Sequence, residues 1–153
     1  MGVTASRVKE QFDAASSVTL RNVSSGAVTS TTTETGITLN ELRTAYWHNY
    51  EVPNGVMEIA VHVTALDTTS GDETYTISLL VDDVTGLNNS PVAIDAFPVT
   101  ATGVYTRYIN SADIPNLDSD HNGTGKYLAV KATLAGTTPS ITYGAWIAGV
   151  ENT

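Results

Sequence analysis

The sequence predicts an all-β protein built as an antiparallel β-sandwich of about eight strands. Between Glu51 and Val150, short runs alternate apolar and polar residues, and each run ends in a turn sequence. Strands of this length and spacing are typical of sandwiches and barrels. With 153 residues and no cysteine, the chain can bury a sizeable core in one domain without disulfides. We therefore expect an N-terminal arm over residues 1–17 and a single β-sandwich domain over residues 18–153.

Composition excludes several classes of partner. Sixteen acidic residues against seven basic ones give a net charge of −9, which repels phosphate backbones and anionic lipid. The most apolar run, residues 77–81, is far too short to span a bilayer. We expect no nucleic-acid partner and no membrane. The absence of cysteine favours a reducing cytoplasm as the place of synthesis, with a bacterial surface protein as the alternative.

The N-terminal third differs from the rest of the chain. Val8, Phe12 and Ala15 share one face of a predicted short helix within residues 1–17. Such a helix is marginal in isolation, so it is expected to dock on its own sandwich or on a neighbouring molecule. The stretch from Ser24 to Thr35 is dominated by serine and threonine. It is interpreted as an edge-strand segment or a flexible, solvated linker.

An aromatic cluster precedes the first long strand. Its members are Tyr46, Trp47 and Tyr50, with His48 among them. Flat aromatic groups with a polar tip suit a sugar-stacking platform or a protein contact patch. We favour the simpler interpretation, in which Trp47 faces the core of a strand while Tyr46 and His48 face the other way.

Two strongly alternating strands follow the turn at Pro53-Asn54-Gly55. The first is expected to turn one set of side chains to the core: Met57, Ile59, Val61, Val63 and Ala65. The opposite, polar face carries Glu58, Ala60, His62 and Thr64. The second strand is expected to bury Tyr75, Ile77, Leu79 and Val81. We expect these two strands to form an antiparallel pair.

Four further strands and one or two before Glu51 complete the predicted set. They span residues 92–99, 104–109, 127–134 and 141–148. Pro98 predicts an edge position for the first of these, because proline cannot donate to a β-ladder. Trp146 is expected to be partly buried, since it alternates with the small residues Gly144 and Ala148.

A calcium loop is suggested within Asp113 to Gly125 but fails on closer inspection. Asp118, Asp120, Asn122 and Gly123 match the opening of an EF-hand loop, yet Ala129 stands where the bidentate glutamate belongs. We expect a solvated hairpin loop, with a simpler calcium site using Asp118, Asp120 and Asn122 as the alternative.

No catalytic constellation is predicted. The histidines His48, His62 and His121 share no metal-ligand spacing, and the chain has no Gly-x-Ser-x-Gly elbow. The pairs Asp72-Glu73 and Asp82-Asp83 fall in predicted turns, where adjacent carboxylates are solvated and point apart. We therefore expect no enzyme activity, no cofactor and no metal.

Three stretches carry a family resemblance: residues 57–67, 71–79 and 136–145. Through them, the segment from Asn54 to Val150 resembles the capsid cement, or decoration, proteins of tailed bacteriophages. The resemblance implies a jelly-roll-like sandwich on the outer surface of an icosahedral head, where it binds the major capsid protein and ties neighbouring capsomeres together. It also implies a virion protein assembled in the bacterial host cytoplasm.

The candidate contact elements are the N-terminal arm, the aromatic cluster and the loop from Asp113 to Gly125. A homo-oligomer, dimer or trimer at local symmetry axes, is expected because the arm and the Ser/Thr-rich segment bury little by themselves. The alternative function is a carbohydrate-binding module or phage fibre domain that uses Tyr46, Trp47 and Tyr50 to bind glycans.

Overall fold

The described part of the chain consists mostly of β-strands, joined by loops and short 3-10 turns. The computed structural model describes residues 19–39, 55–110, 113–115 and 124–152. Its elements are β1 (Thr19–Arg21), η2 (Val23–Ser25), β2 (Ala27–Val28), β3 (Thr32–Thr33), β4 (Ile37–Thr38), β5 (Gly55–Leu66), β6 (Thr74–Asp82), β7 (Val92–Pro98), β8 (Gly103–Asn110), η4 (Thr124–Lys126), β9 (Tyr127–Ala135) and β10 (Ile141–Asn152). None of the helical segments in this part of the chain is long and apolar enough to cross a membrane.

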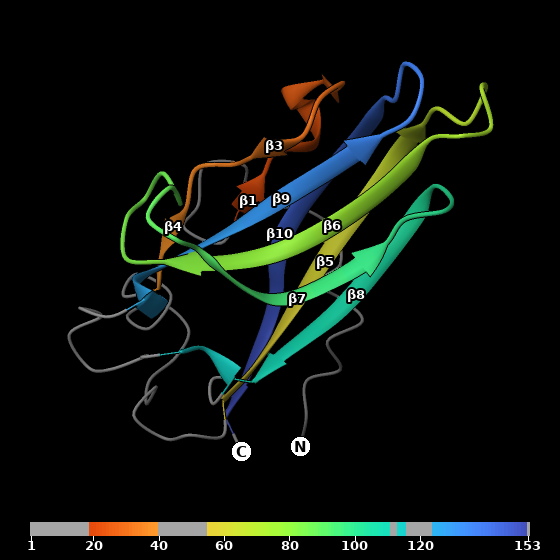
Figure 1. Cartoon of the computed structure of the whole chain (residues 1–153). Helices are drawn as coiled ribbons and strands as arrows, with labels where there is room; N and C mark the ends of the chain where they lie inside the picture. The colour runs from red at the N-terminus through yellow and green to blue at the C-terminus, as the bar shows by residue number, and fades with distance from the viewer. Residues whose placement is uncertain (1–18, 40–54, 111–112, 116–123, 153) are drawn as a thin grey trace.

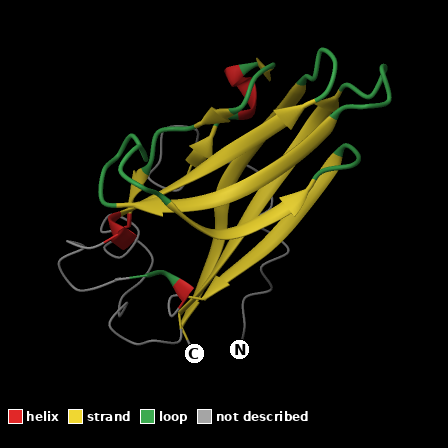
Figure 2. Ribbon diagram, viewed as in Figure 1, coloured by secondary structure: helices red, strands yellow, loops and turns green. Residues whose placement is uncertain are grey.

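The strands form two antiparallel sheets that face each other (Figures 1 and 2). In the first sheet the order is β1-β10-β5-β8, and β2 also pairs with β10. In the second sheet the order is β3-β9-β6-β7, and β4 also pairs with β9. The predicted all-β antiparallel sandwich is therefore confirmed.

The pairing pattern is that of a jelly roll. The innermost strands in sequence, β6 and β7, pair with each other, and β5 pairs with β8 around them. Further out, β9 pairs with β3 and β4, and β10 pairs with β1 and β2. Strands nested in this way describe one long hairpin wound into two sheets, as in a double-sheet jelly roll. The jelly-roll-like topology that the resemblance implied is present.

The predicted pairing of the first two long strands is wrong. β5 pairs with β10 and β8, whereas β6 pairs with β9 and β7 in the opposite sheet. The loop between them, residues 67–73, crosses from one sheet to the other. An apolar face can be buried equally well against a facing sheet, so alternation alone cannot distinguish facing strands from paired ones.

The core lies between the inward faces of the two sheets. It includes Met57, Ile59, Val61 and Val63 of β5, Ile77, Leu79 and Val81 of β6, Leu128 and Val130 of β9, and Ile141, Tyr143 and Ile147 of β10. Ala65, predicted to be inside, is exposed. The reason is a bulge: Thr142 pairs with Ala65 and Tyr143 with Val63, so Thr64 is an extra residue. The bulge reverses the alternation and turns Leu66 toward the core in place of Ala65.

The segment from residue 19 to 38 is part of the sandwich. It contributes four very short strands, β1 to β4, where one or two strands were expected. Leu20 and Val28 are buried in the core, so the linker interpretation of the Ser/Thr-rich stretch is wrong and the edge-strand interpretation is right. Pro98 ends β7, which is an edge strand as predicted.

Candidate functional site

One end of the sandwich carries a hydrogen-bonded polar surface, which we call the loop end and define as residues 67–73 and 136–140. Figure 1 shows the two loops side by side beyond β6 and β9. The Asp72 carboxylate accepts hydrogen bonds from the Thr137 backbone N–H and hydroxyl, both at 3.0 Å. The Tyr75 hydroxyl donates to the Asp67 carbonyl at 2.6 Å and accepts from the Ser140 N–H at 3.0 Å. These bonds join the β5–β6 loop to the β9–β10 loop.

Gly136 permits the close approach of the two loops. Its φ is +102°, and a Cβ at this position would lie 2.6 Å from the Asp72 carbonyl oxygen. An L-residue would therefore meet both backbone strain and a backbone clash here. Glycine is the residue that the joined loops require.

The carboxylates of the loop end organise the backbone. Hydrogen bonds from the Thr69 hydroxyl and N–H lower the pKa of Asp67, and those from the Thr137 N–H and hydroxyl lower the pKa of Asp72. The Glu73 carboxylate accepts the N–H groups of Ser70 and Gly71, each at 2.9 Å. Carboxylates held ionised by such bonds are poor proton donors near neutral pH. The pair Asp72-Glu73 therefore builds a turn and presents negative charge.

The second acidic pair departs from its prediction at Asp82. This residue ends β6 and is 1% exposed, whereas both members were expected to be solvated. Its carboxylate accepts the N–H groups of Asp83 at 2.8 Å and Asn89 at 2.9 Å. The Asn89 side-chain amide in turn donates to Asp83, which lowers the pKa of Asp83. The loop folds back over Asp82 and buries it while satisfying its oxygens.

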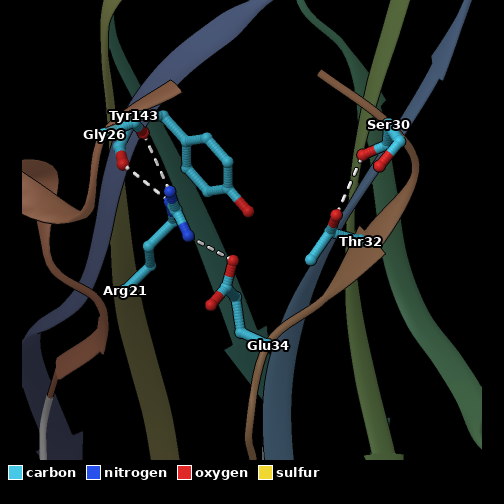
Figure 3. A network of polar contacts seen from close by, with 6 residues as sticks. All are labelled: Arg21, Gly26, Ser30, Thr32, Glu34 and Tyr143. Atoms are coloured by element: carbon cyan, nitrogen blue, oxygen red, sulfur yellow. Dashed lines mark hydrogen bonds and ion pairs between the residues drawn. The ribbon is translucent and has the colours of Figure 1, made fainter. Parts of the chain in front are cut away.

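A second polar network connects β1 of the first sheet with the residue after β3 of the second sheet (Figure 3). Arg21 of β1 forms an ion pair with Glu34, the residue that follows β3 by one position. Its Nε donates to the Tyr143 carbonyl at 3.2 Å and its Nη2 to the Gly26 carbonyl at 2.9 Å. The guanidinium also lies 5.0 Å from the centre of the Tyr143 ring. Arg21 thus connects β1 with Gly26 just before β2, with Glu34 just after β3, and with β10.

Tyr143 lies at the centre of this network, and its hydroxyl is buried. No residue of the described chain hydrogen-bonds that hydroxyl. Burial, together with the Glu34 charge, raises the pKa of Tyr143 well above its ordinary value. Its hydroxyl therefore stays protonated. The network holds strands together and does not act as an acid–base pair.

Of the predicted histidine and metal candidates, only His62 lies among the described residues. His62 lies on the outer face of β5, between Gly144 of β10 and Val104 of β8, as its place on the polar face predicted. The other candidates lie outside the described residues: Tyr46, Trp47, His48, Tyr50, Asp118, Asp120, His121, Asn122 and the arm over residues 1–17. Within the described ranges, no three His, Cys, Asp or Glu side chains come close enough to hold a metal ion. Ala129, the failed twelfth calcium position, lies buried in β9 opposite Leu80.

Trp146 is more deeply buried than predicted. It is 3% exposed and packs with Ala60 and Ala148 on the outer face of the first sheet. Ala60 is its direct cross-strand partner.

The opposite side of the sandwich, where the edge strands β7 and β8 lie, was not singled out from the sequence. Arg107 of β8 binds Asp95 of β7, and Phe97 stacks on Tyr105 with ring centres 5.6 Å apart. On the outer face of β8, Val104 is 49% exposed and Tyr108 is 65% exposed. The sequence could have indicated this surface, because Val104 and Tyr108 lie on the same face of a strand that was correctly predicted.

Comparison of the chain with protein-family models, with curated proteins and with solved structures found no match.

Proposed function

We propose that the protein is a structural virion protein, a capsid cement or decoration protein that binds the outside of an icosahedral phage head. The observation that carries the proposal is the nested strand order of two sheets, because double-sheet jelly rolls are the architecture of viral capsid domains. A fold does not by itself imply a function, so the surfaces must support the same role.

The polar residues of the described chain support a binding role. The side chains of Asp72, Asp82 and Arg21 form hydrogen bonds that hold loops and strands in place. The result is a stiff scaffold with preorganised loops. Preorganisation favours binding, because little conformational entropy is lost when a rigid surface docks.

The loop end is the contact surface that we propose among the described residues. Its two loops are joined by hydrogen bonds, and the pKa values of Asp67 and Asp72 are lowered, so it presents negative charge in a protein of net charge −9. Its complement on the capsid is expected to be basic. The arm, the aromatic cluster and the loop from Asp113 to Gly125 remain candidate contacts that lie wholly or mostly outside the described residues.

The stabilising mechanism is linkage. A protein that binds the assembled, expanded lattice and not its free subunits stabilises the lattice by its own free energy of binding. Symmetry repeats each contact many times, so individually weak contacts add up through high effective concentration. No catalytic step is required.

The test is binding to expanded heads of the phage that encodes the chain, prepared without the protein. We expect the purified protein to co-sediment with these heads at saturating occupancy and to raise their melting temperature. Replacing Thr68 and Ser70 together with lysine should weaken binding, because both are exposed at the loop end. The control is Thr133→Lys, an exposed position on the outer face of the second sheet. Heads that do not bind the wild-type protein would refute the proposal.

Glycan binding is the second candidate function, and one observation favours it. Lectins also use jelly rolls, and Tyr108 offers an exposed ring at 65% on β8. A glycan array distinguishes the two functions. Binding of a glycan that is lost in Tyr108→Ala would favour the carbohydrate-binding module over the cement protein.

A further inference from the structure

β8 is the long edge of the first sheet. Among the described strands it has one neighbour, β5, and no described strand pairs with residues 103–109 on the other side. Unpaired edges template association with another strand, and proteins block them with short strands, proline or charge. The other edges are blocked in these ways, because β1 to β4 have two or three residues each and β7 ends in Pro98.

We propose that two copies of the chain pair through β8, antiparallel, around a two-fold axis that passes at Thr106. Directly opposed residues in an antiparallel pair share a face of the sheet. A two-fold axis normal to the sheet therefore sets even-numbered residues of one copy against even-numbered residues of the other. The register centred on Thr106 overlaps the whole stretch from residue 103 to 109, which spans about 23 Å at the usual rise per residue.

This register brings the exposed apolar side chains of β8 together. Val104 of one copy falls opposite Tyr108 of the other, and symmetry repeats the pair on the far side of Thr106. Both side chains lie on the outer face, with exposed fractions of 49% and 65%. Aromatic and β-branched residues are favourable cross-strand partners. The strand is self-complementary, as an isologous interface requires.

Charge supports a second copy as the occupant. The chain carries −9 overall, so most of its surface repels another copy, yet residues 103–110 contain no acidic side chain. The one charged residue of β8, Arg107, is neutralised by Asp95 of the same chain. In the proposed register, Arg107 falls opposite Tyr105 of the second copy, which is a suitable partner for a guanidinium. Two copies can therefore approach along β8 without like-charge repulsion.

The proposed dimer does not depend on the capsid role. It predicts an oligomeric state of the purified protein in solution, whereas the capsid role predicts binding to heads. Either result can fail while the other stands.

Cysteine cross-linking tests the register. The chain has no cysteine, so Thr106→Cys introduces a single thiol that would face its own symmetry mate at the two-fold axis. We expect rapid, nearly complete disulfide-linked dimer on mild oxidation of Thr106→Cys. The matched control is Thr133→Cys, on the outer face of the second sheet, which should form little disulfide-linked dimer. Equal rates of cross-linking in the two variants would overturn the proposal.

Sedimentation velocity tests the contacts. The full-length wild-type protein should be a concentration-dependent dimer. Val104→Lys should raise the dissociation constant about tenfold or more, corresponding to 1.4 kcal/mol per factor of ten. Adding Tyr108→Glu should restore the dimer, because lysine then faces glutamate across the axis. A wild-type protein that stays monomeric at every concentration refutes the pairing.

Discussion

Arg107 on β8 holds both carboxylate oxygens of Asp95 on β7, with Nε–Oδ2 and Nη2–Oδ1 distances of 2.6 and 2.8 Å. The two strands are edges of different sheets, so this bidentate pair joins the sheets along the open side of the sandwich. The same guanidinium lies 5.2 Å from the centre of the Phe97 ring. The ion pair and the aromatic contacts therefore connect the two sheets on this side, where none of the described strands does.

The Asp95–Arg107 pair predicts a pH-dependent contribution to stability. The Arg107 guanidinium lowers the folded-state pKa of Asp95, so the contribution is complete above the unfolded pKa, about 4, and is lost as pH falls through the folded value. Asp95→Asn should reduce the free energy of unfolding by about 1 kcal/mol at pH 7, because Arg107 is partly exposed. Urea unfolding of wild type, Asp95→Asn, Arg107→Gln and the double variant measures the coupling. A coupling energy unchanged between pH 7 and pH 2 would contradict the assignment.

Removing Arg21 should be severe. Arg21→Met leaves Glu34 without its cation and the Tyr143 and Gly26 carbonyls without their donor, at a cost of about 3 kcal/mol. Thermal and urea unfolding give the value. The double variant Arg21→Met with Glu34→Gln should recover part of the loss, because no unpaired charge is then left in the network. If Arg21→Met has the same free energy of unfolding as wild type, the Arg21 network does not contribute to stability.

The Tyr143 hydroxyl predicts the opposite outcome in the same network. Tyr143→Phe removes a buried hydroxyl for which no described residue provides a hydrogen bond, and it keeps the ring beneath Arg21. We expect stability unchanged or raised by up to about 1 kcal/mol. Calorimetry of the variant beside Tyr75→Phe provides the contrast, since Tyr75 has two hydrogen bonds to lose. A marked loss in Tyr143→Phe would show that the hydroxyl has a partner.

Glycine substitutions at the loop end separate strain from clash. Gly136→Ala should cost about 3 kcal/mol, because it adds a backbone clash with Asp72 to an unfavourable positive φ. Gly71→Ala has a φ of +78° but open space around the new Cβ, so it should cost about 1 kcal/mol. Chemical denaturation measures both. Equal losses would mean that the close approach of the loops is unimportant.

The long strands were predictable because each alternates over many residues. The alternate residues Met57, Ile59, Val61 and Val63 of β5 and Tyr75, Ile77, Leu79 and Val81 of β6 lie inside as predicted, and β5 to β9 begin and end close to their predicted limits. The short strands β1 to β4 were not, since two or three residues cannot express a period. The sequence also did not reveal which strands pair. A strand buries the same apolar side chains whether a second strand lies beside it in its own sheet or opposite it in the other sheet.

The buried polar groups were hidden for a different reason. Arg21 stands in a polar stretch and Asp82 beside another aspartate, so both resemble solvated residues in sequence. Their burial depends on partners far along the chain or around a loop, such as the Tyr143 carbonyl, 122 residues from Arg21. Sequence spacing carries no information about such contacts. The same limit applies to the Asp95–Arg107 pair, which is set by how two edge strands meet.

The nested strand order has a kinetic consequence. β10 lies between β1 and β5, so the first sheet cannot form until residues 141–152 have left the ribosome. Chains dominated by such distant contacts fold slowly, in milliseconds to seconds, and expose unpaired apolar strands meanwhile. Until β10 arrives, the edge of β5 on that side has no paired strand and is open to other nascent chains. We therefore expect yield in a heterologous host to be limited by aggregation during synthesis, and to rise at low temperature more than the stability of the finished sandwich would suggest.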